Sequence, residues 1–170
     1  MEIFSIASGS AQALIENLSD FKKKNILIKA ILLDLDPTAI EHSINLAKEF
    51  NVLGQINFVN KSAHEIEDAV GNFNPNIIEM VGFLEYRPKE KAIKLINKIY
   101  NILEPGGVFL TSNLRNNIER PFLYYAIDWW MVYRSPEEFA EILKEGGFAQ
   151  ENFELIYEPL KIHGIAVCKK

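Results

Sequence analysis

Cysteine, long apolar runs and clusters of positive charge are almost absent from this sequence, and each absence excludes a class of protein. Cys168 is the only cysteine, so the chain can form no internal disulfide and offers no pair of thiolates at a metal-ligand spacing. No apolar run approaches the roughly 18 residues that a membrane-spanning helix needs. The net charge of −5 disfavours capture of nucleic acid or of anionic lipid. We therefore expect a soluble, cytoplasmic, metal-free protein whose partners are small molecules rather than nucleic acid or membrane.

Glycine is also scarce in the first loop, "ASGSA" (7–11), which follows an apolar run at 3–7 and precedes a helical pattern. Only Gly9 supplies the backbone freedom that ligand-binding loops of this kind take from several glycines. Small residues before a helix would let a ligand approach backbone N–H groups closely. The alternative is an ordinary tight turn between a strand and a helix. The lack of a G-x-G-x-x-G pattern disfavours a nicotinamide-dependent oxidoreductase.

Short apolar runs alternate with helical periodicity along the chain, a pattern typical of βα units around a largely parallel sheet. The expected strands cover residues 3–7, 28–36, 54–60, 75–82 and 108–113, and a helix follows each of the first four. Two further runs, 152–159 and 160–170, lie too close together for a parallel crossover and must form an antiparallel hairpin. Since no internal repeat or boundary interrupts the pattern, we expect a single α/β domain, residues 1–170.

The second expected strand ends in two aspartates with different predicted roles. Asp36 precedes Pro37 and so fits the N-cap of the following helix. Asp34 has no such task, and it follows Gly9 by 25 positions. In nucleotide-binding βαβ units, an acidic residue at a spacing of roughly 20 hydrogen-bonds a ribose. A ribose ligand is therefore the preferred interpretation of Asp34, and a solvated carboxylate at a strand end is the alternative.

The order of these segments resembles a class I S-adenosylmethionine-dependent methyltransferase over nearly the whole chain. The segments "LLDLDPTAIEHS" and "LEPGGVFLTSN" carry the resemblance most closely, whereas "SIASGSA" retains only the middle glycine of the family's G-x-G-x-G loop. The resemblance implies a doubly wound Rossmann-like sheet, with parallel strands 3-2-1-4-5 and an antiparallel C-terminal hairpin that completes the order 3-2-1-4-5-7-6. It also implies S-adenosyl-L-methionine as the cofactor and a small molecule as the methyl acceptor.

By the same resemblance, the cofactor site lies on the loops that follow the first four strands. Asp34 would bind the ribose, Leu35 would pack on the adenine, and Glu79 would face the methionine part. The implied cofactor-binding set is Ala7, Ser8, Gly9, Asp34, Leu35, Ser62, Ala63, Glu79, Met80 and Val81. Each of the three histidines is more simply explained as a surface residue, so the sequence assigns no catalytic residue.

Two further features leave the function open. The family normally carries helices before its first strand, so the resemblance implies a core without this helical cap, which a homo-oligomer or a separate N-terminal cap chain would complete. Aromatic residues crowd the segment 122–133, where Tyr125, Trp129, Trp130 and Tyr133 would suit a planar acceptor. The alternative interpretation of this segment is a core or subunit contact. In that case the chain would be a non-catalytic module that binds a partner protein through it.

Overall fold

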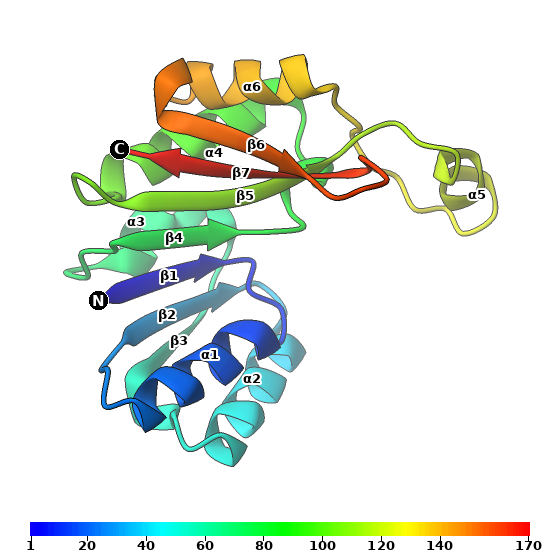
Figure 1. The fold of residues 1–170 in the computed structure, drawn as a ribbon. Coiled ribbons are helices and arrows are strands. Elements are labelled where there is room, and N and C mark those ends of the chain that lie inside the picture. Colours follow the sequence, from blue (N-terminus) through cyan, green and yellow to red (C-terminus); the bar gives the residue numbers. More distant parts are fainter.

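A computed structural model describes all 170 residues and shows one mixed seven-stranded sheet (Figure 1). The strand order is β3-β2-β1-β4-β5-β7-β6, as expected. The first five strands pair in parallel, and β7 runs antiparallel to both β5 and β6. The strands are β1 (Glu2–Ile6), β2 (Lys29–Asp34), β3 (Ile56–Asn60), β4 (Ile77–Met80), β5 (Val108–Leu114), β6 (Phe153–Tyr157) and β7 (His163–Lys169). The α/β class and the antiparallel C-terminal hairpin are thereby confirmed.

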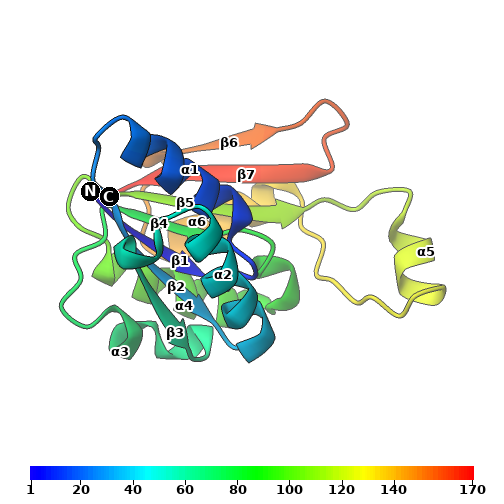
Figure 2. The ribbon, with the colours of Figure 1, turned by 90° about the horizontal axis from the view of Figure 1, so that it is seen from below.

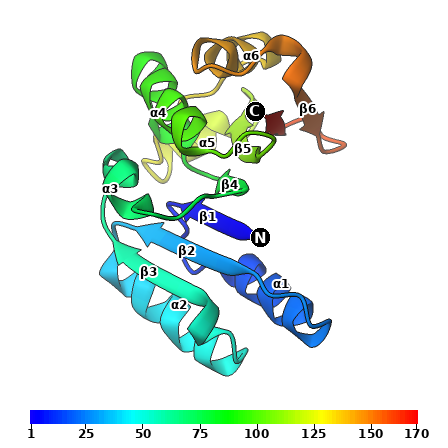
Figure 3. The same cartoon turned by 90° about the vertical axis from the view of Figure 1, so that its left-hand side faces the viewer.

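Helices cover the two faces of the sheet unequally (Figure 3). On one face, α1 (Gln12–Lys23) and α2 (Pro37–Glu49) lie over β1, β2 and β3. The other face carries α3 (Ile66–Val70), α4 (Lys89–Ile102) and α6 (Pro136–Glu145), whereas α5 (Arg120–Tyr125) stands outside both layers (Figure 2). Short 3-10 helices are η1 (Leu53–Gln55), η2 (Ala63–Glu65), η3 (Leu84–Tyr86) and η4 (Gln150–Asn152). None of the helices combines the length and the apolar character that crossing a bilayer requires.

Strand alternation divides the core between the two faces. Phe4 and Ile6 of β1 point into a cluster of 23 buried residues under α3, α4 and α6, while Ile3 belongs to a cluster of 8 under α1 and α2. The ring of Phe109 stacks on that of Phe148 with centroids 5.8 Å apart inside the larger cluster. The larger cluster packs the sheet against α3, α4 and α6, so the loops at the strand ends are anchored to well-packed strands.

Side chains cap the starts of two α-helices, α2 and α6. The side chain of Asp36 accepts a hydrogen bond from the Thr38 backbone N–H at 2.8 Å, with Pro37 as the first helical residue of α2. Ser135 and Glu138 form a reciprocal capping box at α6. The second strand ends at Asp34, two residues earlier than expected, because the Asp34 carboxylate accepts the Asp36 N–H at 2.9 Å and turns the chain.

Candidate functional site

The candidate site lies where the carboxyl ends of the parallel strands meet. The loops after β1, β2, β3 and β4 all leave the sheet at this edge (Figure 1). In open α/β sheets, ligands bind at this edge, beside the point where the strand order reverses. Here the order reverses between β1 and β4. The residues predicted at 7–9, 34–35, 62–63 and 79–81 belong to these four strand ends.

The loop after β1 has an unusual backbone. Ala7, Gly9 and Ala11 have φ angles of 53°, 54° and 48°, so every second residue from 7 to 11 is left-handed. This conformation suits glycine but costs an alanine roughly 1–2 kcal/mol. A Cβ built on Gly9 meets no atom within 4 Å, so that side of the loop is open. The chain therefore keeps the backbone of a glycine-rich loop at two positions where it has alanine.

Neighbouring elements fix this loop through its peptide groups. The Gly9 N–H donates to Asp34 Oδ2 at 2.8 Å, and the Ser8 N–H donates to the Leu33 carbonyl at 3.0 Å. The hydroxyl of Ser43 on α2 lies 3.0 Å from the Gly9 carbonyl oxygen. Asp34 thus has the structural role that the sequence did not indicate. Because these N–H groups already donate within the chain, the loop offers a ligand its shape rather than a set of free donors.

A cavity of about 390 Å³ lies beside this loop. Three predicted residues line it, namely Ser8, Glu79 and Val81. The hydroxyl of Ser8 is buried and has no hydrogen-bond partner. Six lining residues lie outside the predicted set: Ser10 and Ala11, which belong to the 7–11 loop, and Ser5, Gln12, Ala13 and Leu14, which the sequence did not indicate. Gln12, Ala13 and Leu14 form the first turn of α1, so the start of the helical periodicity was the signal that could have found them.

The other predicted cofactor residues differ in how far their side chains are exposed to solvent. Leu35 is 69% exposed beside Asp34, where an apolar side chain could cover a flat ligand. Ser62 accepts the His64 N–H at 3.3 Å as the cap of η2, and Ala63 is buried behind it. The side chain of Met80 is fully buried in the larger core cluster, so its predicted contact with the cofactor falls to its backbone and stays a prediction. Strand alternation places it on the same face as Ile78.

The aromatic segment forms an arm, residues 115–134, that leaves the sheet after β5 and returns before α6 (Figures 1 and 2). Its two ends meet, because the Arg134 N–H donates to the Leu114 carbonyl at 2.9 Å. Most of its large side chains are exposed: Phe122 by 61%, Tyr125 by 84%, Trp129 by 48% and Trp130 by 57%. The core-contact interpretation of this segment is therefore wrong. Tyr133 is half-buried, and its hydroxyl has no hydrogen-bond partner.

The buried groups at the base of the arm are charged. Arg134 is 5% exposed, and its guanidinium donates to the Leu84 carbonyl at 3.0 Å, to Asn113 Oδ1 at 2.6 Å and to the Arg87 carbonyl. Glu85 is 6% exposed, and its Oε2 has no hydrogen-bond partner. Burial raises the pKa of the Glu85 carboxyl, against the opposing charges of Arg134 and His163. Burial also lowers the pKa of Arg134.

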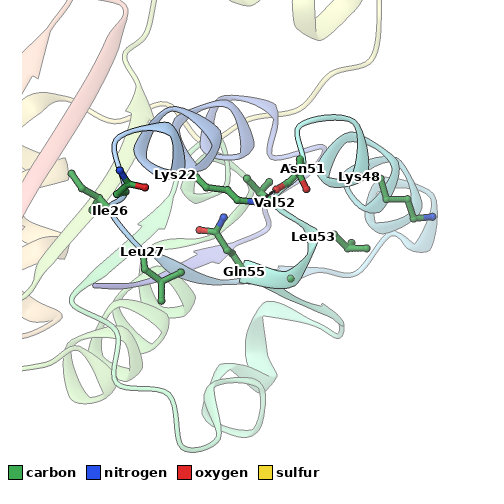
Figure 4. A pocket seen from close by; sticks show the side chains of 10 residues that line it. Lys22, Ile26, Leu27, Lys48, Asn51, Val52, Leu53 and Gln55 are labelled. Atoms are coloured by element: carbon green, nitrogen blue, oxygen red, sulfur yellow. Dashed lines mark hydrogen bonds between the residues drawn. The ribbon is translucent and has the colours of Figure 1, made fainter.

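A larger cavity, of about 710 Å³, lies at the opposite edge of the sheet (Figure 4). It is lined by Lys22 in the last turn of α1, by Ile26 and Asn51 in the turns that follow α1 and α2, and by Gln55 at the end of η1. No residue of the predicted site lies in it. Size alone therefore does not identify the candidate site; the loop conformation and the acidic groups at the carboxyl edge do.

Among the comparisons with known proteins, only the comparison with solved structures found matches. No protein-family model and no curated protein matches the sequence. A putative O-methyltransferase from Nostoc punctiforme superimposes with a TM-score of 0.79 at 14% identity, over 100% of this chain and 52% of that one. A possible exported protein from Bordetella parapertussis gives 0.81 at 17% identity, over 99% and 61%. Human N-acetylserotonin methyltransferase in complex with SAM gives 0.69 at 17%, over 99% and 47%. The chain thus spans between 47% and 61% of the length of these proteins.

Proposed function

We propose that this chain, which has the fold of class I S-adenosylmethionine-dependent methyltransferases, binds S-adenosyl-L-methionine at its carboxyl edge and transfers the methyl group to a small molecule. One observation carries the proposal: the left-handed backbone at Ala7, Gly9 and Ala11, tied to Asp34 through the Gly9 N–H. Strained backbone of this kind persists where the surrounding structure requires it, and it clusters at ligand sites.

The residues at the edge suit the chemical groups of this cofactor. Each Asp34 oxygen accepts one backbone N–H and keeps a second lone pair for a ribose hydroxyl. The methionine end carries a carboxylate and an ammonium, and the 390 Å³ cavity offers one partner for each. The first turn of α1 presents the positive end of a helix dipole, and Glu79 presents a carboxylate. The orphaned Ser8 hydroxyl would complete this contact, and Leu35 would cover the adenine.

In the proposed reaction, the main task of the protein is to position the cofactor and the acceptor. The bound cofactor supplies a methyl group on a sulfonium that is already activated by its charge. The chain's own task is to hold the acceptor in line with that carbon, and such orientation accounts for a large part of the barrier reduction in enzymes. We assign no general base. The acceptor would be a planar or apolar small molecule that contacts Tyr125, Trp129, Trp130 and Tyr133 on the arm.

A second candidate function rests on the exposure of the same arm. Tyr125 is 84% exposed and Trp130 is 57% exposed, and aromatic residues of this kind are enriched at protein interfaces. A non-catalytic module that binds a partner protein through residues 122–133 would use them without any cofactor. The two candidates differ in whether the carboxyl edge binds the cofactor product.

Calorimetric titration with S-adenosylhomocysteine, beside NAD as a control, tests the proposal. We expect a dissociation constant near 1 μM, about −8 kcal/mol, and no heat with NAD. Asp34→Ala should weaken binding by about 100-fold or more, because it removes both the ribose ligand and the anchor of Gly9. Asp34→Asn should weaken binding by about tenfold, since its amide oxygen still accepts one N–H.

Asp36→Asn is the matched control. It makes the same change of charge two residues away, and asparagine is as good an N-cap as aspartate. Its affinity for S-adenosylhomocysteine should equal that of the unaltered chain. Equal losses in Asp34→Asn and Asp36→Asn would exclude a specific role for Asp34. An absence of heat with the unaltered, folded chain would reject the methyltransferase proposal and favour the partner-binding module.

A further inference from the structure

The arm is attached to the rest of the molecule at its base and at one place beyond it. At the base, the Arg134 N–H donates to the Leu114 carbonyl, and the Arg115 N–H donates to the Ile162 carbonyl at 2.8 Å. Beyond the base, both contacts are made with η3, which closely follows β4. There the Val132 N–H donates to the Glu85 carbonyl at 2.7 Å, and the Trp129 Nε1–H donates to the Tyr86 hydroxyl at 2.9 Å. Only the bond between Trp129 and Tyr86 joins side chains of the arm and η3.

The arm packs mainly against itself. The rings of Tyr124 and Trp130 lie 3.9 Å apart by their centroids, and the Trp129 N–H donates to the Leu123 carbonyl at 2.8 Å. The guanidinium of Arg120 lies 5.1 Å from the centre of the Tyr133 ring. A loop whose ends meet and whose side chains pack together can turn about its ends as one unit. Figures 1 and 2 show it standing away from the sheet at the edge that carries the 7–11 loop.

We propose that the arm is a lid for the carboxyl edge and that Tyr86 is the positioning residue that holds it in the open orientation seen here. The inference rests on the proposed function, since it takes the cofactor site as the surface that the lid covers. Closure would bury the aromatic side chains that are now exposed, and such burial favours the closed state when a ligand fills the space beneath. Tyr86 is well placed for this role because η3 links β4, with Glu79 near its end, to α4.

The chain carries its own probe of this motion. Both of its tryptophans, Trp129 and Trp130, lie in the arm, so intrinsic tryptophan fluorescence reports on the arm alone. A Trp130→Phe background leaves Trp129 as the single reporter. In that background, Tyr86→Phe removes only the hydroxyl that accepts the indole N–H. Tyr124→Phe is the matched control, because it removes the hydroxyl of another arm tyrosine and keeps the ring that packs against position 130.

In the ligand-free chain, Tyr86→Phe should shift the Trp129 emission to longer wavelength and increase its quenching by acrylamide. Tyr124→Phe should change neither, and both variants should keep the thermal midpoint of the background. A purely structural role of Tyr86 would instead lower the midpoint. If the emission and quenching of Tyr86→Phe equal those of the background, Tyr86 does not position the arm and the proposal is wrong.

Titration with S-adenosylhomocysteine tests closure, with the heat of binding measured on the same samples. We expect the emission to shift to shorter wavelength and acrylamide quenching to fall, with the midpoint of both changes at the calorimetric dissociation constant. Chymotrypsin, which cuts after aromatic residues, should cleave the arm more slowly in the complex. Heat without any change in fluorescence or cleavage would overturn the lid and leave the proposed function standing. No heat would reject the proposed function and, with it, the surface that the lid is proposed to cover.

Discussion

Two connections leave the same edge of the sheet and are held in opposite ways. In the 7–11 loop, the backbone N–H groups of Ser8, Gly9 and Ala11 all donate within the chain, and the Gly9 carbonyl meets Ser43. In the arm, residues 115–134, side chains such as Tyr125 and Trp130 stand in solvent. The first connection is fixed residue by residue, and the second is fixed at its ends and by two hydrogen bonds to η3. The loop is thus built to present one shape, whereas most of the large side chains of the arm are exposed.

This difference separates the two tasks of the proposed reaction. A cofactor of constant structure is best held by a rigid backbone, because pre-organised groups cost no ordering on binding. An acceptor must enter and leave, so the element that contacts it has to give access. The predictions that follow test how rigid the first region is and how independent the second is.

Among the variants in the arm, Arg134→Met should have the largest effect on stability, because Arg134 joins the arm to the rest of the chain. Its buried guanidinium donates to Leu84, Asn113 and Arg87. Its loss would leave the acceptors of Asn113 and Arg87 without this donor, whereas the Leu84 carbonyl still accepts the Arg87 N–H at 3.0 Å. We expect the free energy of unfolding to fall by about 2–4 kcal/mol. Urea denaturation measures this loss. Arg115→Met is the control, since Arg115 is half-exposed and makes one side-chain hydrogen bond, at 3.3 Å. An equal loss in both variants would show that the arm has no firm attachment at Arg134.

The fold follows from the sequence because local signals and packing agree there. Short apolar runs alternate with amphipathic helices, Asp36 and Ser135 cap their helices, and the two final strands are too close together to be parallel. The arm carries no such signal. The composition of the arm, rich in aromatic residues, favours burial, yet most of these side chains are exposed. The only helix in the arm is the short α5. The ends of the arm meet through the hydrogen bond between Leu114 and Arg134, a contact between distant positions that no local pattern encodes.

Glu85→Gln should change the pH dependence of stability at the base of the arm. Burial raises the pKa of Glu85 above its usual 4.5, so the folded chain binds its proton more tightly than the unfolded chain does. Stability attributable to this group is therefore greatest below the unfolded pKa and falls as the pH rises through the folded pKa. The glutamine variant stays neutral, so it should match the native chain near pH 4 and be the more stable of the two near pH 8.

Urea denaturation between about pH 4 and about pH 8 measures this dependence. Glu90→Gln serves as the control, because Glu90 is an exposed residue in the first turn of α4. Its pH profile should follow that of the native chain. If Glu85→Gln has the same profile as well, the Glu85 carboxyl is not held in a desolvated site beneath the arm.

Ala7→Gly and Ala11→Gly should each stabilise the chain by about 0.5–1 kcal/mol. Both alanines have left-handed backbone, a conformation that glycine adopts without a steric cost. The removal of this steric cost outweighs the larger conformational entropy that glycine has in the unfolded state. Ala13→Gly makes the same change within α1 and should instead cost about 0.5–1 kcal/mol. Thermal or urea unfolding separates the two signs. Destabilisation by all three variants would mean that the loop does not hold this strained conformation in solution.

The candidate site was only partly readable from the sequence. The spacing of Gly9 and Asp34 indicated that the two residues act together, and the structure joins them by a hydrogen bond. The role of Asp34 as an anchor for the loop was not readable, because it depends on the register in which β1 pairs with β2. The burial of the Met80 side chain was predictable in principle, since strand alternation puts it on the same face as Ile78.

Tyr125→Ala should have the smallest effect, a change of about 0.5 kcal/mol or less in the free energy of unfolding, because its side chain is 84% exposed. Phe122→Ala, in the same short helix, should behave alike. Phe109→Ala, which opens a cavity in the larger core cluster, should cost about 3–5 kcal/mol. Urea denaturation of the three variants measures these losses in the free energy of unfolding and compares the arm with the core. Because the arm's aromatic rings contribute so little to folding, a large loss in Tyr125→Ala would require a second surface that already covers the arm, such as another copy of the chain. The loss would then grow with protein concentration, and that dependence would separate an assembled arm from a free one.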